Sequence, residues 1–225
     1  MSTSEALGLL NLLQLASPAL PVGAYSYSEG IETLIEQQIV CDRDSLYTWL
    51  DTELSYGSIR IETAVTIRAY LAAQHQDWEN ISFWNSWLSA SRETLELRRS
   101  SQQMGQSLLK LVEDLEPGDT VPLKAHSCNY AIAFGIAAFR WQVNLESAIL
   151  AYLQAWTTHL IGAGVKLIPL GQTTGQQLLW MLRDRLITTA TEVRSLPDTA
   201  LSSCNWGLSL ASMAHETQYM RLFRS

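Results

Sequence analysis

Apolar residues recur at the three- and four-residue spacing of amphipathic helices along most of the chain. The clearest runs lie in residues 7–15, 31–35, 46–54, 61–71, 84–88, 92–112, 131–138, 145–165 and 178–182. No alternating apolar and polar run is long enough to indicate a strand. We therefore predict an all-α fold of about eight to ten helices, with residues 1–225 in a single domain and residues 131–138 as its central helix.

Capping residues predict where several of these helices begin. Asp44 is expected to cap the helix that contains residues 46–54, and Asp77 to open the tryptophan-rich helix that follows. Asn144 is expected to cap the long helix that Pro169 must end. The pairs that fit a capping box before the next helix are Thr173 with Gln176 and Thr174 with Gln177.

Residues 17–30, with the sequence SPALPVGAYSYSEG, look least like a helix. Pro18 and Pro21 predict an extended path, and Gly23 then allows a turn that a β-carbon would oppose. Tyr25 and Tyr27 follow at alternate positions, each beside a serine. A loop specified in this way usually carries a binding surface, so we expect its tyrosines to anchor a partner.

Composition narrows the class of partner. The net charge is −7 and there is no run of Lys or Arg, which argues against binding to nucleic acid or to an anionic membrane. Only 16% of the residues are charged, so part of the surface is uncharged and suited to lasting contact with proteins. The N-terminus lacks a basic leader, and the three cysteines form no CxxC pair, which predicts a reduced, cytoplasmic protein.

One stretch has a length close to that of a membrane span. Residues 147–165 contain no charged side chain, but Gln154, Thr157 and His159 lie in the middle, where hydrocarbon would leave their polar groups unpaired. A buried core helix, with His159 as a hydrogen-bonded core residue, is the better interpretation.

The motifs of several enzyme classes are missing. No phosphate-binding loop, dinucleotide fingerprint or zincin pattern occurs, so we predict no cofactor and no resident metal. His126 and Cys128 could form a soft metal site or a Cys–His nucleophile pair. A loop histidine beside a buried thiol is the favoured interpretation. An all-α enzyme or small-ligand binder that uses His126 and Cys128, with Tyr25 and Tyr27 as a lid, remains the alternative function.

Four segments together resemble one known family. Residues 15–32, 99–109, 165–173 and the tail 215–225 are similar, in this order, to the motifs of the urease accessory protein UreF family. The first and last motifs are the most specific, and the match covers essentially the whole chain. The resemblance implies an all-helical, non-enzymatic scaffold that forms a homodimer. It also implies a complex with UreD and the GTPase UreG that delivers nickel to apo-urease.

The resemblance also assigns partner-binding residues. Those in the N-terminal motif are Pro21, Gly23, Tyr25, Tyr27, Glu29 and Gly30; those in weaker internal motifs are Arg98, Gln103, Met104, Gly105 and Lys166; those in the tail are Arg221, Leu222, Phe223, Arg224 and Ser225. Residues 206–225 are expected to act as a partner-binding tail. In the isolated protein we expect this tail to be mobile, or docked only on its own domain, and to order further in the complex.

Overall fold

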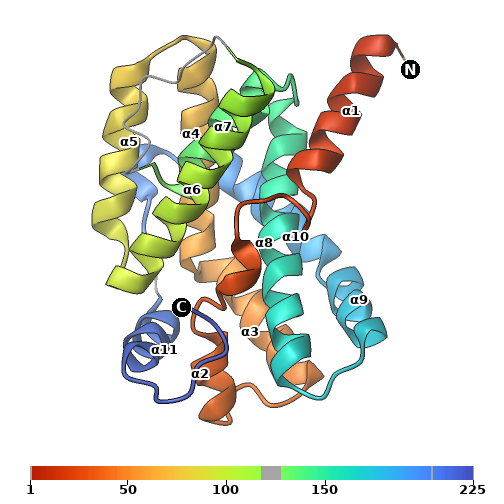
Figure 1. Ribbon diagram of the computed structural model, residues 1–225, viewed down its shortest axis with the longest axis vertical. Helices are drawn as coiled ribbons and strands as arrows, with labels where there is room; N and C mark the ends of the chain where they lie inside the picture. The colour runs from red at the N-terminus through yellow and green to blue at the C-terminus, as the bar shows by residue number, and fades with distance from the viewer. Residues whose placement is uncertain (1, 118–127, 204, 225) are drawn as a thin grey trace.

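The computed structural model describes residues 2–117, 128–203 and 205–224 (Figure 1). Within these ranges the chain forms α-helices and short 3-10 turns and contains no strand, so the all-α prediction is confirmed. The eleven α-helices of the described ranges are α1 Thr3–Leu15, α2 Ile31–Glu36, α3 Arg43–Tyr56, α4 Ser58–Gln74, α5 Trp78–Ser91, α6 Leu95–Leu115, α7 Tyr130–Arg140, α8 Leu145–Leu167, α9 Gln172–Met181, α10 Arg183–Arg194 and α11 Trp206–Glu216.

Helix α7 lies at the centre, as its uniformly apolar sequence predicts. Residues 131–138 are all buried, and α4, α6 and α8 pack around them (Figure 1). The approach to α4 is close because Gly135 has no side chain: a β-carbon there would lie 2.5 Å from the Thr66 carbonyl oxygen and 2.9 Å from the Ala69 β-carbon. The core is therefore built on a contact that needs glycine at this position.

The helix starts follow the predictions in part. The Asp77 side chain accepts from the Asn80 amide, and the Asn144 side chain accepts from the Ser147 amide, so both caps are confirmed. The Asp44 cap is wrong, because Asp42 caps α3: its carboxylate accepts from the Ser45 amide at 2.8 Å. The Ser45 hydroxyl in turn accepts from the Asp42 amide at 3.0 Å, which closes a capping box.

The capping box expected at Thr173 and Thr174 is also wrong. Helix α9 begins at Gln172, before either threonine, with Gly171 as the capping position and no side-chain cap bond. Both threonines therefore lie within the first turn. The resulting helix carries Leu178, which is fully buried, on its inner face.

Helix α10 is an element that the sequence did not reveal. Its apolar stripe is short, with Leu186, Thr189 and Val193 buried, and it contains several β-branched residues that disfavour isolated helices. Tertiary contacts stabilise it: the Thr189 hydroxyl donates to the Leu54 carbonyl oxygen at 2.9 Å, and Glu192 forms an ion pair with Arg60 at 2.7 Å.

Helix α8 runs along the front of the molecule beside α2, α4 and α10 (Figure 1). It buries much of its length against them, as the core-helix interpretation predicts. Among the described helices, none is both long and apolar enough to cross a membrane. Helix α11 packs on α2 and α6, and the chain then returns to the front, where its C-terminal end lies near the loop that precedes α2 (Figure 1).

Candidate functional site

The loop of residues 17–30 is compact rather than extended. The Leu20 amide donates to the Ser17 carbonyl oxygen at 3.0 Å, so the two prolines sit in successive turns and the predicted extended path is wrong. Gly23 does adopt the left-handed conformation expected of it, with φ of 79°. Gly30 has φ of 82° and is buried against α11, where a β-carbon would lie 3.1 Å from the Ala211 β-carbon.

The two tyrosines of the loop have different environments. Tyr25 is 73% exposed, whereas Tyr27 is 5% exposed and its hydroxyl donates to Gln103 Oε1 on α6 at 2.7 Å. The Trp156 indole on α8 donates to Glu29 Oε2 at 2.9 Å. Glu29 and Tyr27 therefore fasten the loop to two helices. Only Tyr25 presents its ring to the surface, and its role in binding a partner stays a prediction.

A cavity of about 210 Å³ lies between this loop, α6, α8 and the C-terminal segment. Its apolar wall includes Leu20, Met104 and Phe223. The polar wall includes Glu62, whose carboxylate accepts from Arg92 at 2.7 Å. The hydroxyl of Tyr152 also donates to Glu62, at 2.9 Å.

Burial changes the protonation of several groups near the cavity. Desolvation, and then the charge of Glu62, raises the pKa of Glu29 to about 7. Desolvation, followed by the charges of Glu29 and Glu93, raises the pKa of Glu53 to about 8. His159 hydrogen bonds to the Tyr27 backbone, but burial lowers its pKa to about 4 and its Nε2 has no hydrogen-bond partner. His159 is half-buried and lines the cavity, so the expectation of a core residue is met only in part.

These groups do not form a metal site. Within the described ranges, no three His, Cys, Asp or Glu side chains are placed so that they could hold a metal ion. The carboxylates instead pair with the Arg92 guanidinium and with tyrosine, tryptophan and amide donors. In the cavity wall, Glu29 is the carboxyl group whose raised pKa of about 7 lets it take up or release a proton near neutral pH.

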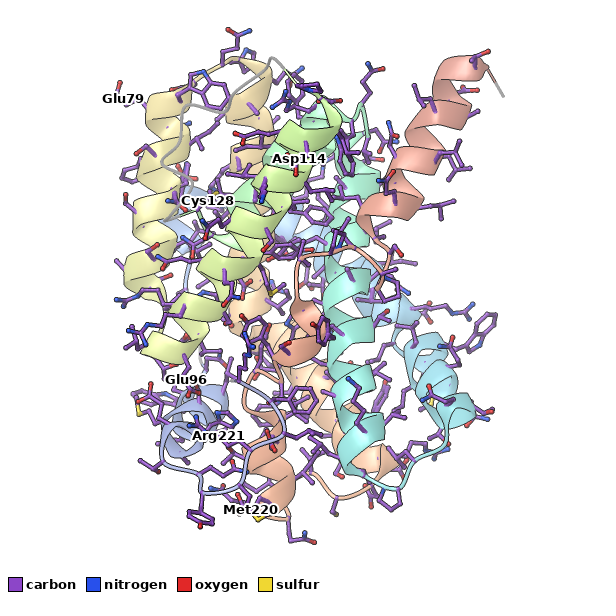
Figure 2. The ribbon with its side chains drawn as sticks, in the orientation of Figure 1. Glu79, Glu96, Asp114, Cys128, Met220 and Arg221 are labelled. Atoms are coloured by element: carbon purple, nitrogen blue, oxygen red, sulfur yellow. The ribbon has the colours of Figure 1, made fainter. Side chains whose placement is uncertain are left out.

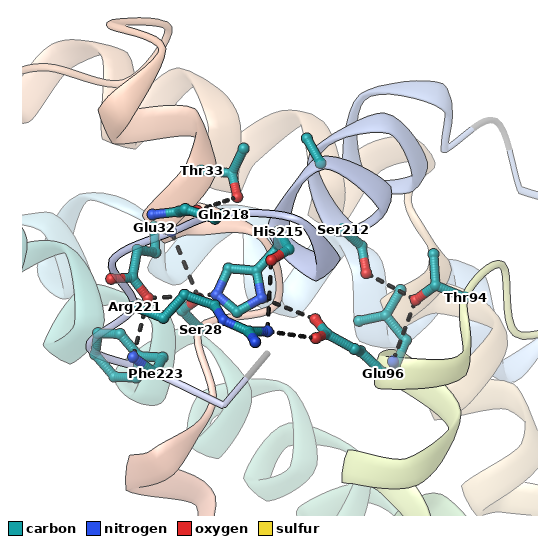
Figure 3. Close-up of polar contacts among 12 residues, drawn as sticks. Ser28, Glu32, Thr33, Thr94, Glu96, Ser212, His215, Gln218, Arg221 and Phe223 are labelled. Carbon is teal, nitrogen blue, oxygen red and sulfur yellow. Dashed lines mark hydrogen bonds and ion pairs between the residues drawn. The ribbon is translucent and has the colours of Figure 1, made fainter.

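The C-terminal segment is docked on its own domain, one of the two states expected for it. The backbone amides of Leu222 and Phe223 donate to the two carboxylate oxygens of Glu32 at 2.6 Å and 2.9 Å (Figure 3). The Arg224 amide donates to the Ser26 carbonyl oxygen at 2.8 Å. Phe223 is 5% exposed and its ring forms part of the cavity wall.

A buried histidine lies behind this segment. His215, on α11, has no exposed surface; its Nδ1 is 2.8 Å from a Glu96 oxygen and its Nε2 is 3.4 Å from a Glu32 oxygen (Figure 3). The other Glu96 oxygen accepts from Arg221 at 2.9 Å, and these two side chains meet near the start of α6 (Figure 2). Two carboxylates from different helices therefore contact both α11 and the tail.

The remaining residues that were predicted to bind partners have different environments. Lys166 places its Nζ 5.4 Å from the Phe223 ring centroid, and Pro21 is exposed. Arg98 is half-buried on α6. Gly105 is buried, and a β-carbon there would collide with the Cys128 carbonyl oxygen, so its environment is that of a packing residue. Ser225 lies outside the described residues.

Three residues of this region were not identified from the sequence. Glu32, Glu96 and Trp156 make their contacts with residues more than one hundred positions away. The only local signal is at Glu32, which is a charged residue next to Ile31 on the apolar face of a short helix.

The alternative site loses support. Cys128 is 1% exposed, and burial raises the pKa of its thiol to about 12, so the thiolate that a nucleophile or metal ligand requires is disfavoured. Cys128 is also absent from the residues that line the cavity. His126 lies outside the described residues. The buried-thiol interpretation of Cys128 is therefore confirmed.

Comparison with known proteins identifies the family of this chain. The UreF family model matches residues 40–183. The urease accessory protein UreF of Nostoc sp. is 58% identical over 96% of this chain and 95% of its own length. The UreF of Synechocystis sp. is 49% identical over 96% of this chain and 97% of its own length. The UreF of Chromohalobacter salexigens is 39% identical over 100% of this chain and 98% of its own length. The chain therefore belongs to the UreF family of urease accessory proteins.

Proposed function

We propose that this protein is a non-enzymatic scaffold for urease maturation in the cytoplasm. In this role it forms a homodimer, bridges UreD and the GTPase UreG, and takes part in delivering nickel to apo-urease. Near full-length similarity to proteins named urease accessory protein UreF supports the proposal.

One structural observation carries the proposal further. The N-terminal loop and the C-terminal tail, which bear the two most specific family motifs, meet at one place on the surface: the Arg224 amide bonds to the Ser26 carbonyl oxygen. Tyr25, next to Ser26 in the chain, and Leu222, two residues before Arg224, are both exposed. Exposed aromatic and aliphatic side chains beside arginine are typical of protein–protein contacts.

Co-purification tests the proposal. UreD, UreG and the tagged protein are expressed together, and a matched culture lacks only this protein. We expect both partners to be recovered on the tagged protein, and UreD and UreG not to be recovered together without it. Recovery of only one partner, or an undiminished UreD–UreG complex in the matched culture, contradicts the bridging role.

A further inference from the structure

We propose that Glu32, Glu96 and His215 form a latch that holds residues 217–224 on the protein body and thereby positions the tail beside the N-terminal loop for partner binding. These three are positioning residues, since they act through the tail. The inference rests on the proposed scaffold function for its biological meaning, while the latch itself can be tested on the isolated protein.

The tail has few other attachments. Tyr219 is 99% exposed, Met220 78% and Leu222 66%, so the segment has little buried surface apart from Phe223. It contains no helix, and outside the latch its side-chain bonds include one from Thr33 to Gln218 at 3.0 Å. A segment of this kind is ordered only where specific bonds offset the conformational entropy that it loses.

Glu32 holds the backbone of the tail. Two consecutive backbone amides face its two carboxylate oxygens, at 2.6 Å for Leu222 and 2.9 Å for Phe223 (Figure 3). Hydrogen bonds to an ionised acceptor are stronger than neutral ones, and successive amides form a concave anion-binding site. Because Glu32 binds the backbone, it fixes the direction in which the side chains of both residues point. Phe223 then enters the cavity wall while Leu222 remains at the surface.

Glu96 and His215 connect this anchor to two further helices. Glu96 lies in the first turn of α6 and contacts both His215 and Arg221. His215 lies near the end of α11 and contacts Glu32 and Glu96 with its two ring nitrogens. The start of α6 is joined to α11 a second time, through the hydroxyls of Thr94 and Ser212 at 2.7 Å. Helices α2, α6 and α11 therefore converge on the tail.

The geometry predicts how a substitution acts. A carboxylate offers an acceptor to each of the two tail amides, whereas the amide of Gln offers one acceptor oxygen and one NH₂ donor. Glu32→Gln therefore leaves one tail amide facing a donor while it preserves the shape of the side chain. Glu96→Gln removes the charge that pairs with Arg221 and is a second, independent way to weaken the latch. Glu36→Gln is the matched control, since Glu36 is exposed on the same short helix as Glu32.

Hydrogen exchange on the purified full-length protein tests the latch. We expect the amides of Leu222 and Phe223 to exchange at least about tenfold faster in Glu32→Gln than in Glu36→Gln, with the amides of α4 and α7 unchanged. Glu96→Gln should accelerate the same two amides. Unchanged exchange at Leu222 and Phe223 in both variants overturns the latch. Acceleration spread equally over α4 and α7 also overturns it, because that result indicates a general loss of stability.

Partner capture tests the positioning role. We expect Glu32→Gln and Glu96→Gln to recover several-fold less UreD or UreG than Glu36→Gln does, at equal amounts of folded protein. Undiminished recovery of both partners, in variants whose tail amides exchange faster, overturns the positioning role. If the unmodified protein captures neither partner, the proposed scaffold function fails and the positioning role fails with it. The exchange experiment still decides whether the latch exists.

Discussion

Replacing Glu53 by Gln should stabilise the protein at alkaline pH and remove much of the pH dependence of its folding. Glu53 lies on α3 and is 6% exposed. In the orientation that satisfies its hydrogen bonds, the side-chain amide of Asn205 points its nitrogen at Glu53. That nitrogen then lies 3.0 Å and 3.2 Å from the two Glu53 carboxyl oxygens. Burial is the largest cause of its raised pKa of about 8, and the carboxylates of Glu29, Glu93 and Glu62 add to it. The folded protein therefore favours the neutral form of this side chain.

The sign of the effect follows from proton linkage. The unfolded chain releases the Glu53 proton near the ordinary pKa of 4.5, whereas the folded protein retains it up to about pH 8. Below pH 4.5 this proton stabilises the folded protein fully. The stabilisation falls as the pH rises from 4.5 towards 8, and it is gone above the folded-state pKa of about 8. One pKa unit corresponds to about 1.4 kcal/mol, so the loss between about pH 5.5 and about pH 8.5 is about 3 kcal/mol. Gln keeps the neutral form at every pH and avoids this loss.

Chemical denaturation followed by far-ultraviolet circular dichroism measures the effect. The free energy of unfolding of the unmodified protein should fall by about 3 kcal/mol relative to Glu53→Gln between these two pH values. Glu36→Gln, in which an exposed carboxylate is removed, should follow the unmodified protein. Some pH dependence should remain in Glu53→Gln, because the pKa of Glu29 is also raised, to about 7. Parallel pH profiles for the unmodified protein and Glu53→Gln would refute the reasoning.

Three further predictions concern the tyrosines of the loop, a glycine of α6 and the cysteine thiols. Tyr27→Phe should lower the free energy of unfolding by about 1 kcal/mol through loss of its bond to α6, whereas Tyr25→Phe should leave it nearly unchanged; equal effects in denaturation curves would contradict this. Gly105→Ala should destabilise the protein by about 1–3 kcal/mol, measured in the same way. A neutral result would refute the close contact of Gly105 with the Cys128 backbone. A thiol reagent at neutral pH should label exposed Cys41 and leave buried Cys128 unmodified until the protein unfolds, as peptide mass spectrometry would show; early labelling of Cys128 would argue against its burial.

Local signals in the sequence were sufficient for much of the fold. The uniformly apolar run of α7 identified the central helix, and Asp77 and Asn144 marked helix starts because a capping side chain acts within three residues of itself. The cap of α3 was assigned to the wrong aspartate, since Asp42 and Asp44 are both good caps. The choice depends on Ser45, which lies at the third helical position after Asp42 and whose hydroxyl accepts a bond from the Asp42 amide.

Long-range contacts account for what could not be predicted. Helix α10 is stabilised by bonds to α3 and α4, such as that from Thr189 to the Leu54 carbonyl oxygen, and its own sequence is a poor helix former. The docking of the tail on Glu32 joins positions about 190 residues apart, so no local pattern could reveal it. The two motif tyrosines looked equivalent in the sequence. Only the folded chain shows that Tyr27 bonds to α6 while Tyr25 stays exposed.

The nickel content of urease tests the central claim most directly. Apo-urease is incubated with nickel, GTP, UreD and UreG, with or without this protein, and is then separated from the accessory proteins and analysed for bound metal. We predict that bound nickel and urease activity rise together, and severalfold, only when this protein is present. Equal nickel in urease with and without it would contradict a role in delivering the metal.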